Sequence, residues 1–422
     1  MNRKRIFVYA APLIAAALAV VALLIQWRGA PPPRQSASLT FARSFAMQMV
    51  RGADGVLLAQ QNVQVPKFEY DPGWPKPFPN ETWAIGPIAG LAVDRQDHIW
   101  VVHRPGILRG NERFTAAEVK PPKAECCVPA PPVLEFDQSG TLISSWGGPG
   151  EGYEWPQNEH GIFVDHKDFV WLAGNGAKDT HLLKFTRQGT FVKQFGRQGK
   201  SGGNADTQNL AGAANLTVDP TSNEVYVADG YRNRRVIVLD ADTLAFKRMW
   251  GAYGNPPEDT DIGPYNPDAP VAKQFRLPHN ISVSRDGMVY VADRVNNRVQ
   301  AFKKDGTFVK EGFISRRTLL AGAASGFALS ADPQQRFLYV IDGANHRIWI
   351  VLRESLQVVG RFGQQGLSGG GMNVPHAVGV DSKGNIYIGE NFDARRVQRF
   401  LYKGMGSPTS AAGVIPPAKA IQ

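Results

Sequence analysis

Three histidines stand at the same point of a repeated sequence pattern, and they are the side chains best suited to chemistry. His160, His279 and His376 each begin a short stretch of alternating apolar residues that ends five residues later in Asp or Ser. The chain has only 8 histidines, so three in one register is a marked concentration. Neutral imidazole is a common ligand of Zn²⁺, and also of Fe, Co, Ni and Cu. If the fold brings the three rings together, they predict a transition-metal site.

The stretch that carries these histidines is repeated, and the repeats define the elements that would position them. Each copy has two strand-like segments joined by a polar turn, and further strand-like segments such as "TFVKQFG" and "QVVGRFG" often follow. The six copies open with the segments 89–102, 160–173, 214–228, 279–292, 327–341 and 376–389. Repeats of roughly 40 to 50 residues with four short strands are typical of propeller blades. The sequence therefore predicts an all-β, six-bladed β-propeller.

One register, compared across the six copies, shows histidine in every second copy. It reads Ala89, His160, Ala214, His279, Phe327 and His376. In a propeller the first strand of each blade lines the central axis, and alternate blades of six are about 120° apart. The three rings should therefore converge on the axis. Three imidazoles with an open fourth position are the arrangement of a catalytic zinc site.

Three further residues can reach the same end of the channel. Arg104, Tyr231 and Arg294 each follow the second strand of a predicted blade, where the chain turns toward the channel mouth. Guanidinium groups bind carboxylates, and a side chain near a metal can act in acid–base catalysis. Together with the histidines, these residues predict a pocket for a carboxylate-bearing substrate at a metal.

The sequences of these turns and of the motifs around them resemble those of two known groups of proteins. The turns "VADGYRNRRV" and "VADRVNNRVQAF" resemble NHL repeats, which occur in binding modules and in enzymes. Most of the segment 88–402 also resembles peptidyl-α-hydroxyglycine α-amidating lyase, whose fold is a six-bladed propeller with an axial zinc. The matching motifs, in the order of that family, are "VHRPG" (102–106), "EHG" (159–161), "DGY" (229–231), "PHN" (278–280), "ADR" (292–294) and "VPHA" (374–377).

The resemblance to the lyase implies a role for each motif residue. His160, His279 and His376 would be zinc ligands, and Tyr231 would be the general base. Arg104 and Arg294 would bind and polarise the substrate. The implied reaction splits a carbinolamide, –CO–NH–CH(OH)–COO⁻, into an amide and glyoxylate.

The chain departs from the lyase pattern at three positions next to these motifs. Ala377 replaces the family's Asp, which belongs to a structural calcium site, and this argues against calcium here. Val374 replaces a Met, and Arg232 replaces a Cys, so the family's disulfide is absent. No hydroxylase domain that would make the hydroxyglycine is present in the sequence given.

Two other functions remain open from the residues alone. A different metal-dependent propeller hydrolase, such as a lactonase, would share the axial metal but needs carboxylates around it. A non-catalytic NHL binding module would present the same face to a protein or cell-wall ligand without a metal.

The N-terminal residues predict an exported protein. Arg3, Lys4 and Arg5 precede an apolar run over 6–25, which is about long enough to span a bilayer. We expect residues 1–28 to be a signal anchor or a cleaved signal peptide. The linker would cover 29–64, the propeller 65–402 and a disordered tail 403–422. The protein would then lie on the periplasmic face of the inner membrane, or be secreted.

Charge and cysteine content add two weaker expectations. The net charge is +10, but basic residues are spread along the chain, so we expect no nucleic-acid partner. The membrane contact would be made by the N-terminal segment. The only cysteines are the adjacent pair Cys126 and Cys127, which could form a vicinal disulfide that staples a loop or could remain free thiols.

Overall fold

A computed structural model of the protein describes residues 63–109, 112, 119–408 and 414–415. The predicted signal segment (1–28) and nearly all of the predicted linker (29–64) lie outside these residues. In the described part of the chain, no helix is both long enough and apolar enough to cross a membrane.

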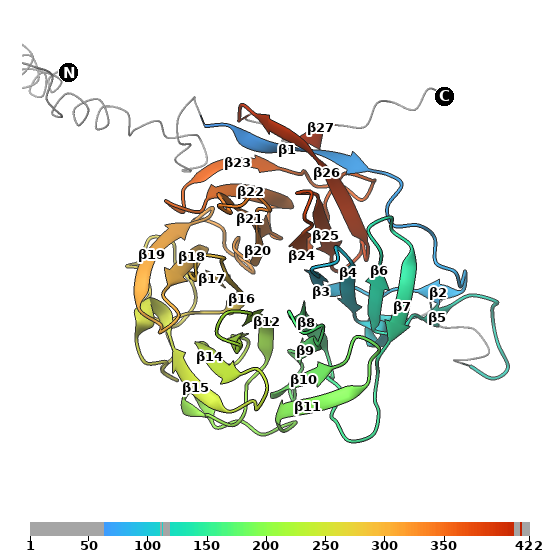
Figure 1. Ribbon diagram of the computed structural model, residues 1–422, viewed down its shortest axis with the longest axis horizontal. Coiled ribbons are helices and arrows are strands. Elements are labelled where there is room, and N and C mark those ends of the chain that lie inside the picture. The colour runs from blue at the N-terminus through green and yellow to red at the C-terminus, as the bar shows by residue number, and fades with distance from the viewer. Residues whose placement is uncertain (1–62, 110–111, 113–118, 409–413, 416–422) are drawn as a thin grey trace, which may run out of the picture. The chain divides into compact units, whose positions relative to one another are not determined.

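Six antiparallel sheets surround a common axis, as Figure 1 shows, which confirms the predicted six-bladed propeller. With strands written from inner to outer, blade one is β3(Ile88–Val93), β4(Ile99–His103), β6(Val133–Phe136) and β7(Leu142–Trp146), and blade two is β8(Glu159–Val164), β9(Val170–Gly174), β10(His181–Phe185) and β11(Phe191–Gly196). Blade three is β12(Ala213–Asp219), β13(Glu224–Asp229), β14(Arg235–Asp240) and β15(Phe246–Trp250), and blade four is β16(Pro278–Val283), β17(Val289–Asp293), β18(Arg298–Phe302) and β19(Phe308–Phe313). Blade five is β20(Gly326–Leu329), β21(Phe337–Asp342), β22(Arg347–Leu352) and β23(Val358–Phe362), and blade six is β24(Pro375–Val380), β25(Ile386–Glu390), β26(Val397–Gly406) and β1(Val65–Asp71).

The aspartate that ends the first strand of several repeats has a structural role. The Asp94 carboxylate accepts hydrogen bonds from the backbone N–H of Gln96 (2.9 Å) and from the indole N–H of Trp100 (2.9 Å). Asp165 accepts a hydrogen bond from Trp171 in the same way at 2.8 Å. Each carboxylate thus stabilises the turn after the first strand and satisfies a fully buried indole between the blades.

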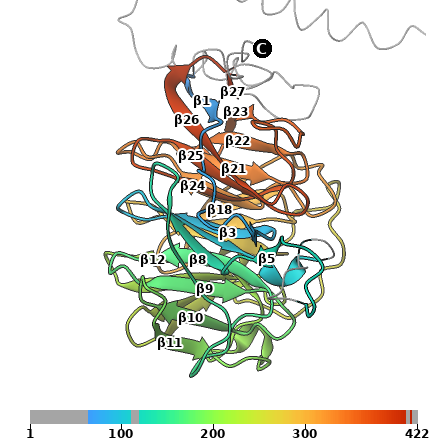
Figure 2. The same cartoon turned by 90° about the vertical axis from the view of Figure 1, so that its right-hand side faces the viewer.

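The last blade is closed by the N-terminal strand. β1 pairs antiparallel with β26, so the segment 65–71 supplies the outer strand that the repeats leave missing, and Figure 2 shows the two strands side by side. Phe68 of β1 is completely buried, with its ring 4.9 Å from Phe362 and 5.5 Å from Tyr339. The ring of blades is therefore held shut by apolar packing as well as by strand pairing.

The C-terminal boundary differs from the prediction. β26 continues to Gly406, and β27(Val414–Ile415) pairs in parallel with β1, although both lie in the segment 403–422 that was expected to be disordered. β26 extends because its partner β1 offers backbone groups as far as Val65, which pairs with Gly406.

An insertion between β4 and β6 of the first blade, residues 104–132, leaves the sheet after β4. Its described part contains a short 3₁₀ helix η1(Pro105–Ile107) and the strand β5(Val128–Pro129), which pairs with β2(Trp83–Ala84). Cys126 and Cys127 are joined by a disulfide just before β5. Two further 3₁₀ turns, η3(Gly203–Ala205) and η4(Ala252–Gly254), lie between later blades.

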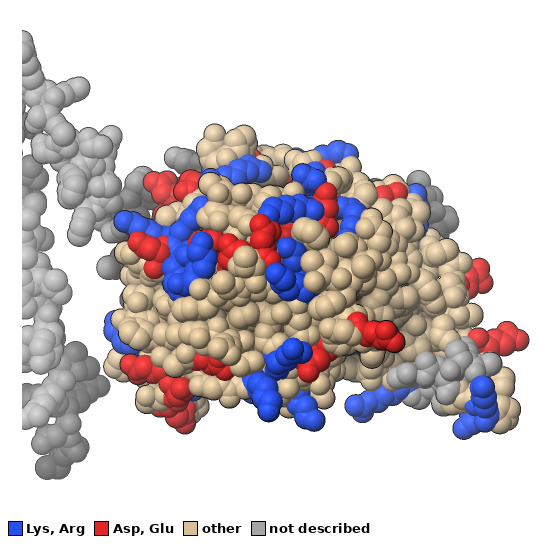
Figure 3. Space-filling view, turned by 60° about the horizontal axis from the view of Figure 1, so that its bottom comes forward, with Lys and Arg blue, Asp and Glu red and all other residues tan. Residues whose placement is uncertain are grey.

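Charges of both signs are mixed on the surface. On the face shown in Figure 3, basic and acidic side chains lie close to one another and form no field of one sign. Ion pairs such as Lys167–Asp242 (2.8 Å) and Arg353–Asp286 (2.8 Å) link neighbouring blades. Such exposed pairs contribute little to stability, so the propeller depends mainly on its apolar core.

We expect the closing strand to be essential for stability. Replacing Phe68 by Ala should lower the free energy of unfolding by about 3–5 kcal/mol, because it leaves a cavity between β1 and blade five. The control Phe246→Ala, on the partly exposed outer strand β15, should cost about 0.5 kcal/mol or less. Urea titration followed by tryptophan fluorescence measures both. Equal effects of the two substitutions would contradict this account of ring closure.

Candidate metal centre and active site

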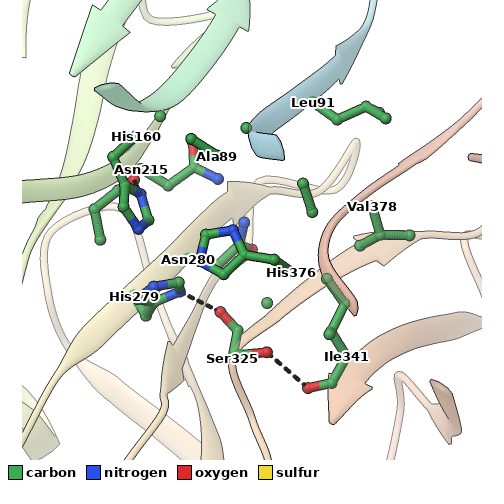
Figure 4. A pocket seen from close by; sticks show the side chains of 15 residues that line it. Ala89, Leu91, His160, Asn215, His279, Asn280, Ser325, Ile341, His376 and Val378 are labelled. Atoms are coloured by element: carbon green, nitrogen blue, oxygen red, sulfur yellow. Dashed lines mark hydrogen bonds between the residues drawn. The ribbon is translucent and has the colours of Figure 1, made fainter. Parts of the chain in front are cut away.

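The three predicted histidines meet on the propeller axis. His160, His279 and His376 lie at the starts of the inner strands β8, β16 and β24, and their side chains line the cavity in Figure 4. All three are buried, and the ring centroids are 4.9, 5.0 and 5.3 Å apart. One ring nitrogen of each lies within 4.8 Å of the other two. This spacing allows three imidazoles to bind one metal ion.

Backbone carbonyls of the intervening blades orient the rings. His160 Nδ1 is 2.6 Å from the carbonyl oxygen of Ala214, and His279 Nδ1 is hydrogen-bonded to the carbonyl of Ser325. For His376, no Nδ1 hydrogen bond of regular geometry is formed within the described residues, although the Ala89 backbone is close enough to act on its pKa. A carbonyl only accepts, so Nδ1 carries the hydrogen and Nε2 keeps a lone pair for a ligand.

Strand pairing corrects the register that the sequence comparison gave to the fifth repeat. The sequence comparison placed Phe327 there, but strand pairing aligns Gly326 with Ile341 just as Asn280 aligns with Ala292. Ser325, the residue before Gly326, is therefore the counterpart of His279. The register alternates between histidines, which supply ring nitrogens, and Ala89, Ala214 and Ser325, which present carbonyls.

Burial keeps the three rings neutral. The pKa values of His160 and His279 are held well below the usual value, chiefly by loss of solvation and next by their cationic or imidazole neighbours. Burial, with Arg294 and Arg104 nearby, lowers the pKa of His376 to about 3. Neutral imidazole is the form that binds metals, so the site is prepared for a cation at ordinary pH.

Tyr231 and Arg294 reach the same nitrogens from two neighbouring loops. The Tyr231 hydroxyl lies 2.7 Å from His160 Nε2 and 3.1 Å from His279 Nε2. Arg294 Nη1 lies 3.3 Å from His279 Nε2, while its Nε donates to the carbonyl of Ala321 at 2.9 Å. The tyrosine and the second arginine therefore contact the histidine cluster directly, as the sequence pattern indicated.

The loop that carries Tyr231 is pressed against the strand that carries His279. Gly230 lies so close to Pro278 that a Cβ atom there would be 2.0 Å from the Pro278 carbonyl oxygen. Only glycine fits at this point, and this explains the Gly in the "DGY" motif. The close approach sets the hydroxyl within reach of the imidazoles.

Arg104 approaches from the first blade. It is nearly buried, its Nε donates to the carbonyl of Glu159 at 2.8 Å, and its Nη2 is 3.4 Å from Asn175 Oδ1. Burial raises the pKa of Tyr231, and the charges of Arg294 and Arg104 oppose that rise. The two guanidinium groups thus act on the phenol and place positive charge beside the imidazoles, and we call this group the cationic pocket.

Asn175 belongs to this pocket but was not singled out from the sequence. Its Oδ1 accepts a hydrogen bond from Asn158 Nδ2 at 2.5 Å and faces Arg104. It directly follows β9, as Arg104 follows β4 and Arg294 follows β17. Comparing the residue after each second strand would have found it.

Arg232, which replaces a Cys of the lyase pattern, does not point into the pocket. Its Nη1 donates to the carbonyl of Gly176 at 2.9 Å and its Nη2 to the carbonyl of Asp179 at 3.0 Å. The guanidinium therefore ties the Tyr231 loop to the loop after β9 and adds no charge at the site.

A second group of side chains with metal-ligand geometry is occupied by the guanidinium of Arg187. Asp94, His98 and Glu135 lie close together, and Arg187 Nη2 sits among them, 2.6 Å from Asp94 Oδ2 and 2.6 Å from His98 Nδ1. It also forms an ion pair with Glu135. These contacts join Arg187 of blade two to three side chains of blade one, so the cluster stabilises the packing of the two blades.

Comparison with known proteins agrees with this fold, and the relatives include amidating enzymes. Residues 275–302 match the NHL repeat family. The chain is 25% identical over 356 residues to NHL repeat-containing protein 3 of Mus musculus, covering 80% of this chain and 84% of that protein. It is 23% identical over 333 residues to peptidyl-glycine alpha-amidating monooxygenase A of Xenopus laevis, covering 76% of this chain but only 32% of that protein. It is 22% identical over 404 residues to peptidyl-alpha-hydroxyglycine alpha-amidating lyase 2 of Drosophila melanogaster, covering 91% and 88% of the two chains.

The histidine cluster predicts stoichiometric metal binding. Purified protein incubated with zinc and then dialysed should retain about one ion per chain, as a tetrahedral site with three protein ligands does. The substitution His279→Ala should abolish retention, while the control His166→Ala, outside the cluster, should not. Elemental analysis by mass spectrometry gives the result. Retention by His279→Ala at the level of the control would place the metal elsewhere.

Proposed function

We propose that this protein is a metal-dependent lyase that cleaves acyl- or peptidyl-α-hydroxyglycine into the corresponding amide and glyoxylate. The observation that carries the proposal is the meeting of three neutral imidazoles with the Tyr231 phenol and the Arg294 guanidinium, with the Arg104 charge close enough to act on the phenol. The similarity to amidating lyases supports the same reaction class.

The donor set fits a metal such as zinc. His160 and His279 have Nδ1 committed to carbonyls, so their Nε2 atoms are acceptors. Tyr231 and Arg294 can each donate one hydrogen bond to these atoms. Three neutral imidazoles with one ring nitrogen each within 4.8 Å of the others also have the spacing to bind one cation, and we propose that the three histidines hold it. When bound, a divalent metal supplies Lewis acidity that lowers the pKa of a hydroxyl group beside it.

The two arginines would orient the substrate by its carboxylate. Their fixed hydrogen bonds, to the carbonyls of Glu159 and Ala321, use only some of the five N–H donors that each guanidinium carries. The remaining donors would bind a carboxylate by charge-assisted hydrogen bonds. With the carboxylate held by Arg104 and Arg294, the α-hydroxyl lies toward the histidines.

Tyr231 is placed to move the proton that the reaction requires. The O–H bond of the α-hydroxyl breaks and its oxygen forms the aldehyde of glyoxylate, while the C–N bond breaks and the amide nitrogen gains a proton. The phenolate form of Tyr231 can accept the first proton, and Arg104 and Arg294 favour that form. Burial raises the pKa of the resulting phenol and so holds the proton on it until the nitrogen takes it.

We further propose that the protein acts outside the cytoplasm. The segment 6–25 would anchor the chain in the inner membrane, or would be removed as a signal peptide. The disulfide between Cys126 and Cys127 supports an oxidising compartment.

One alternative has an observation of its own. The match to NHL repeat-containing protein 3 covers most of both chains, and that name assigns no reaction, so the alternative is a binding module without catalysis. A metal-dependent hydrolase is less favoured, because the axial cluster in the described residues contains three histidines without a carboxylate.

The proposed reaction predicts metal-dependent release of glyoxylate. N-acetyl-α-hydroxyglycine should be cleaved by the zinc-loaded protein, and a chelator should stop the reaction. Tyr231→Phe should lower kcat by about 100- to 10,000-fold, the range for loss of general acid–base catalysis. Tyr402→Phe, on β26 away from the site, is the matched control. A folded, zinc-loaded protein that releases no glyoxylate would rule out this substrate class and favour the binding module.

A further inference from the structure

The most exposed large apolar side chains gather on the face that carries the site. Among the described residues, four have more than half of their surface exposed: Leu319 (56%), Leu320 (88%), Leu367 (57%) and Phe392 (62%). The other large apolar residues with high exposure lie on strands away from the axis, four of them on outer strands and Tyr402 on β26: Ile143, Val192, Phe246, Val309 and Tyr402. We name the first four residues the apolar rim.

The strand order places the whole apolar rim on the site face. The inner strands begin at this face, so in an antiparallel blade the second strand ends there and the next blade is joined there. Leu319, Leu320 and Leu367 lie in blade-to-blade connections, and Phe392 follows the second strand β25. His279 opens β16 at the same face.

Hydrogen bonds link the loops of the rim to one another. Asn345 donates to Thr318 at 3.0 Å, the backbone N–H of Val374 donates to His346 Nδ1 at 3.0 Å, and that of Asn391 donates to Val374 at 3.2 Å. Arg396 donates to the carbonyl of Leu367. The four apolar side chains therefore stand on loops that are fixed to one another over blades five and six.

Two rim residues have a backbone conformation that bulky side chains rarely adopt. Leu320 and Phe392 both have φ of +49°. The left-handed region is unfavourable for such residues and is found mainly where function requires it. In both cases the result is a large apolar side chain that projects into solvent.

The rim is continuous with the catalytic pocket. Ala321, next to Leu320, accepts the hydrogen bond from Arg294 Nε at 2.9 Å. A Cβ on Gly322 would lie 2.0 Å from the Arg294 carbonyl oxygen, so the loop is packed directly against this arginine. A ligand whose carboxylate is bound by Arg294 can therefore extend over Leu320 without leaving the protein.

We propose that the apolar rim binds an apolar group on the acyl side of the substrate. The inference rests on the proposed function and narrows its substrate class to α-hydroxyglycines whose acyl or peptidyl group carries a large apolar portion. The cationic pocket takes the carboxylate, and the only strongly exposed apolar surface in the described residues lies beside it. The substrate would be amphipathic, with its charged end on the axis and its apolar end over blades five and six.

Calorimetry with the zinc-loaded full chain tests this inference without turnover. N-octanoylglycine and N-acetylglycine lack the α-hydroxyl and cannot be cleaved. The octanoyl compound should bind about tenfold more tightly, the effect of removing roughly two methylene groups from water. In the variant that combines Leu320→Ser with Phe392→Ser, the ratio of the two affinities should fall toward one. Ile143→Ser, which removes an exposed apolar residue from the outer strand β7, should leave the ratio as in the unaltered protein.

Failure of this inference can be told from failure of the proposed reaction. Glyoxylate release without an octanoyl preference would overturn the inference and leave the lyase intact. An octanoyl preference that depends on the rim, without glyoxylate release, would support the rim and overturn the lyase. A preference that survives both substitutions, or a rim variant that instead alters self-association or vesicle binding with the ratio unchanged, would show that the rim has another occupant and would overturn the inference.

Discussion

The site depends on buried ion pairs that recur at the ends of second strands. Asp229 and Arg235 are 3.0 Å apart and Asp293 and Arg298 2.9 Å apart, and none of these side chains is exposed. The other oxygen of Asp293 accepts a hydrogen bond from the backbone of Leu277, just before β16. One carboxylate thus fixes both the loop of an arginine and the strand of a histidine. Removing one partner of such a pair costs about 3–5 kcal/mol, so these pairs stabilise the loops that carry Tyr231 and Arg294.

The fold was predictable because each blade repeats the same physical solution. Alternating apolar residues, a turn aspartate and a second strand recur in every copy, and the register of the histidines follows from them. The regular alternation of apolar residues also explains why Phe327 was wrongly assigned to the histidine register. The fifth copy has Ser325 in place of histidine, and a shift of two residues preserves the alternation of inward and outward side chains, so the pattern alone cannot detect it.

The parts of the site that could not be predicted are those made by the backbone. Carbonyl groups orient His160 and His279, and any residue type can supply a carbonyl. Carbonyls also bind the Arg232 guanidinium, which the sequence alone would allow to face the substrate. Asn175 was missed for a different reason, since an asparagine after a strand is common in turns and only a comparison of the residue after each second strand would have singled it out.

The closure of the ring by β1 has a consequence for the order of assembly. β1 is the first described strand to be synthesised, yet its partner β26 is almost the last. Until then β1 presents unpaired backbone groups, and the blade that holds His376 lacks its outer strand. The inner strand β24, which carries His376, belongs to this blade, so the spacing of the three histidines depends on the pairing that completes it. If the histidines hold a metal as proposed, its retention would then mark a finished ring, which a chain cut short during synthesis could not form.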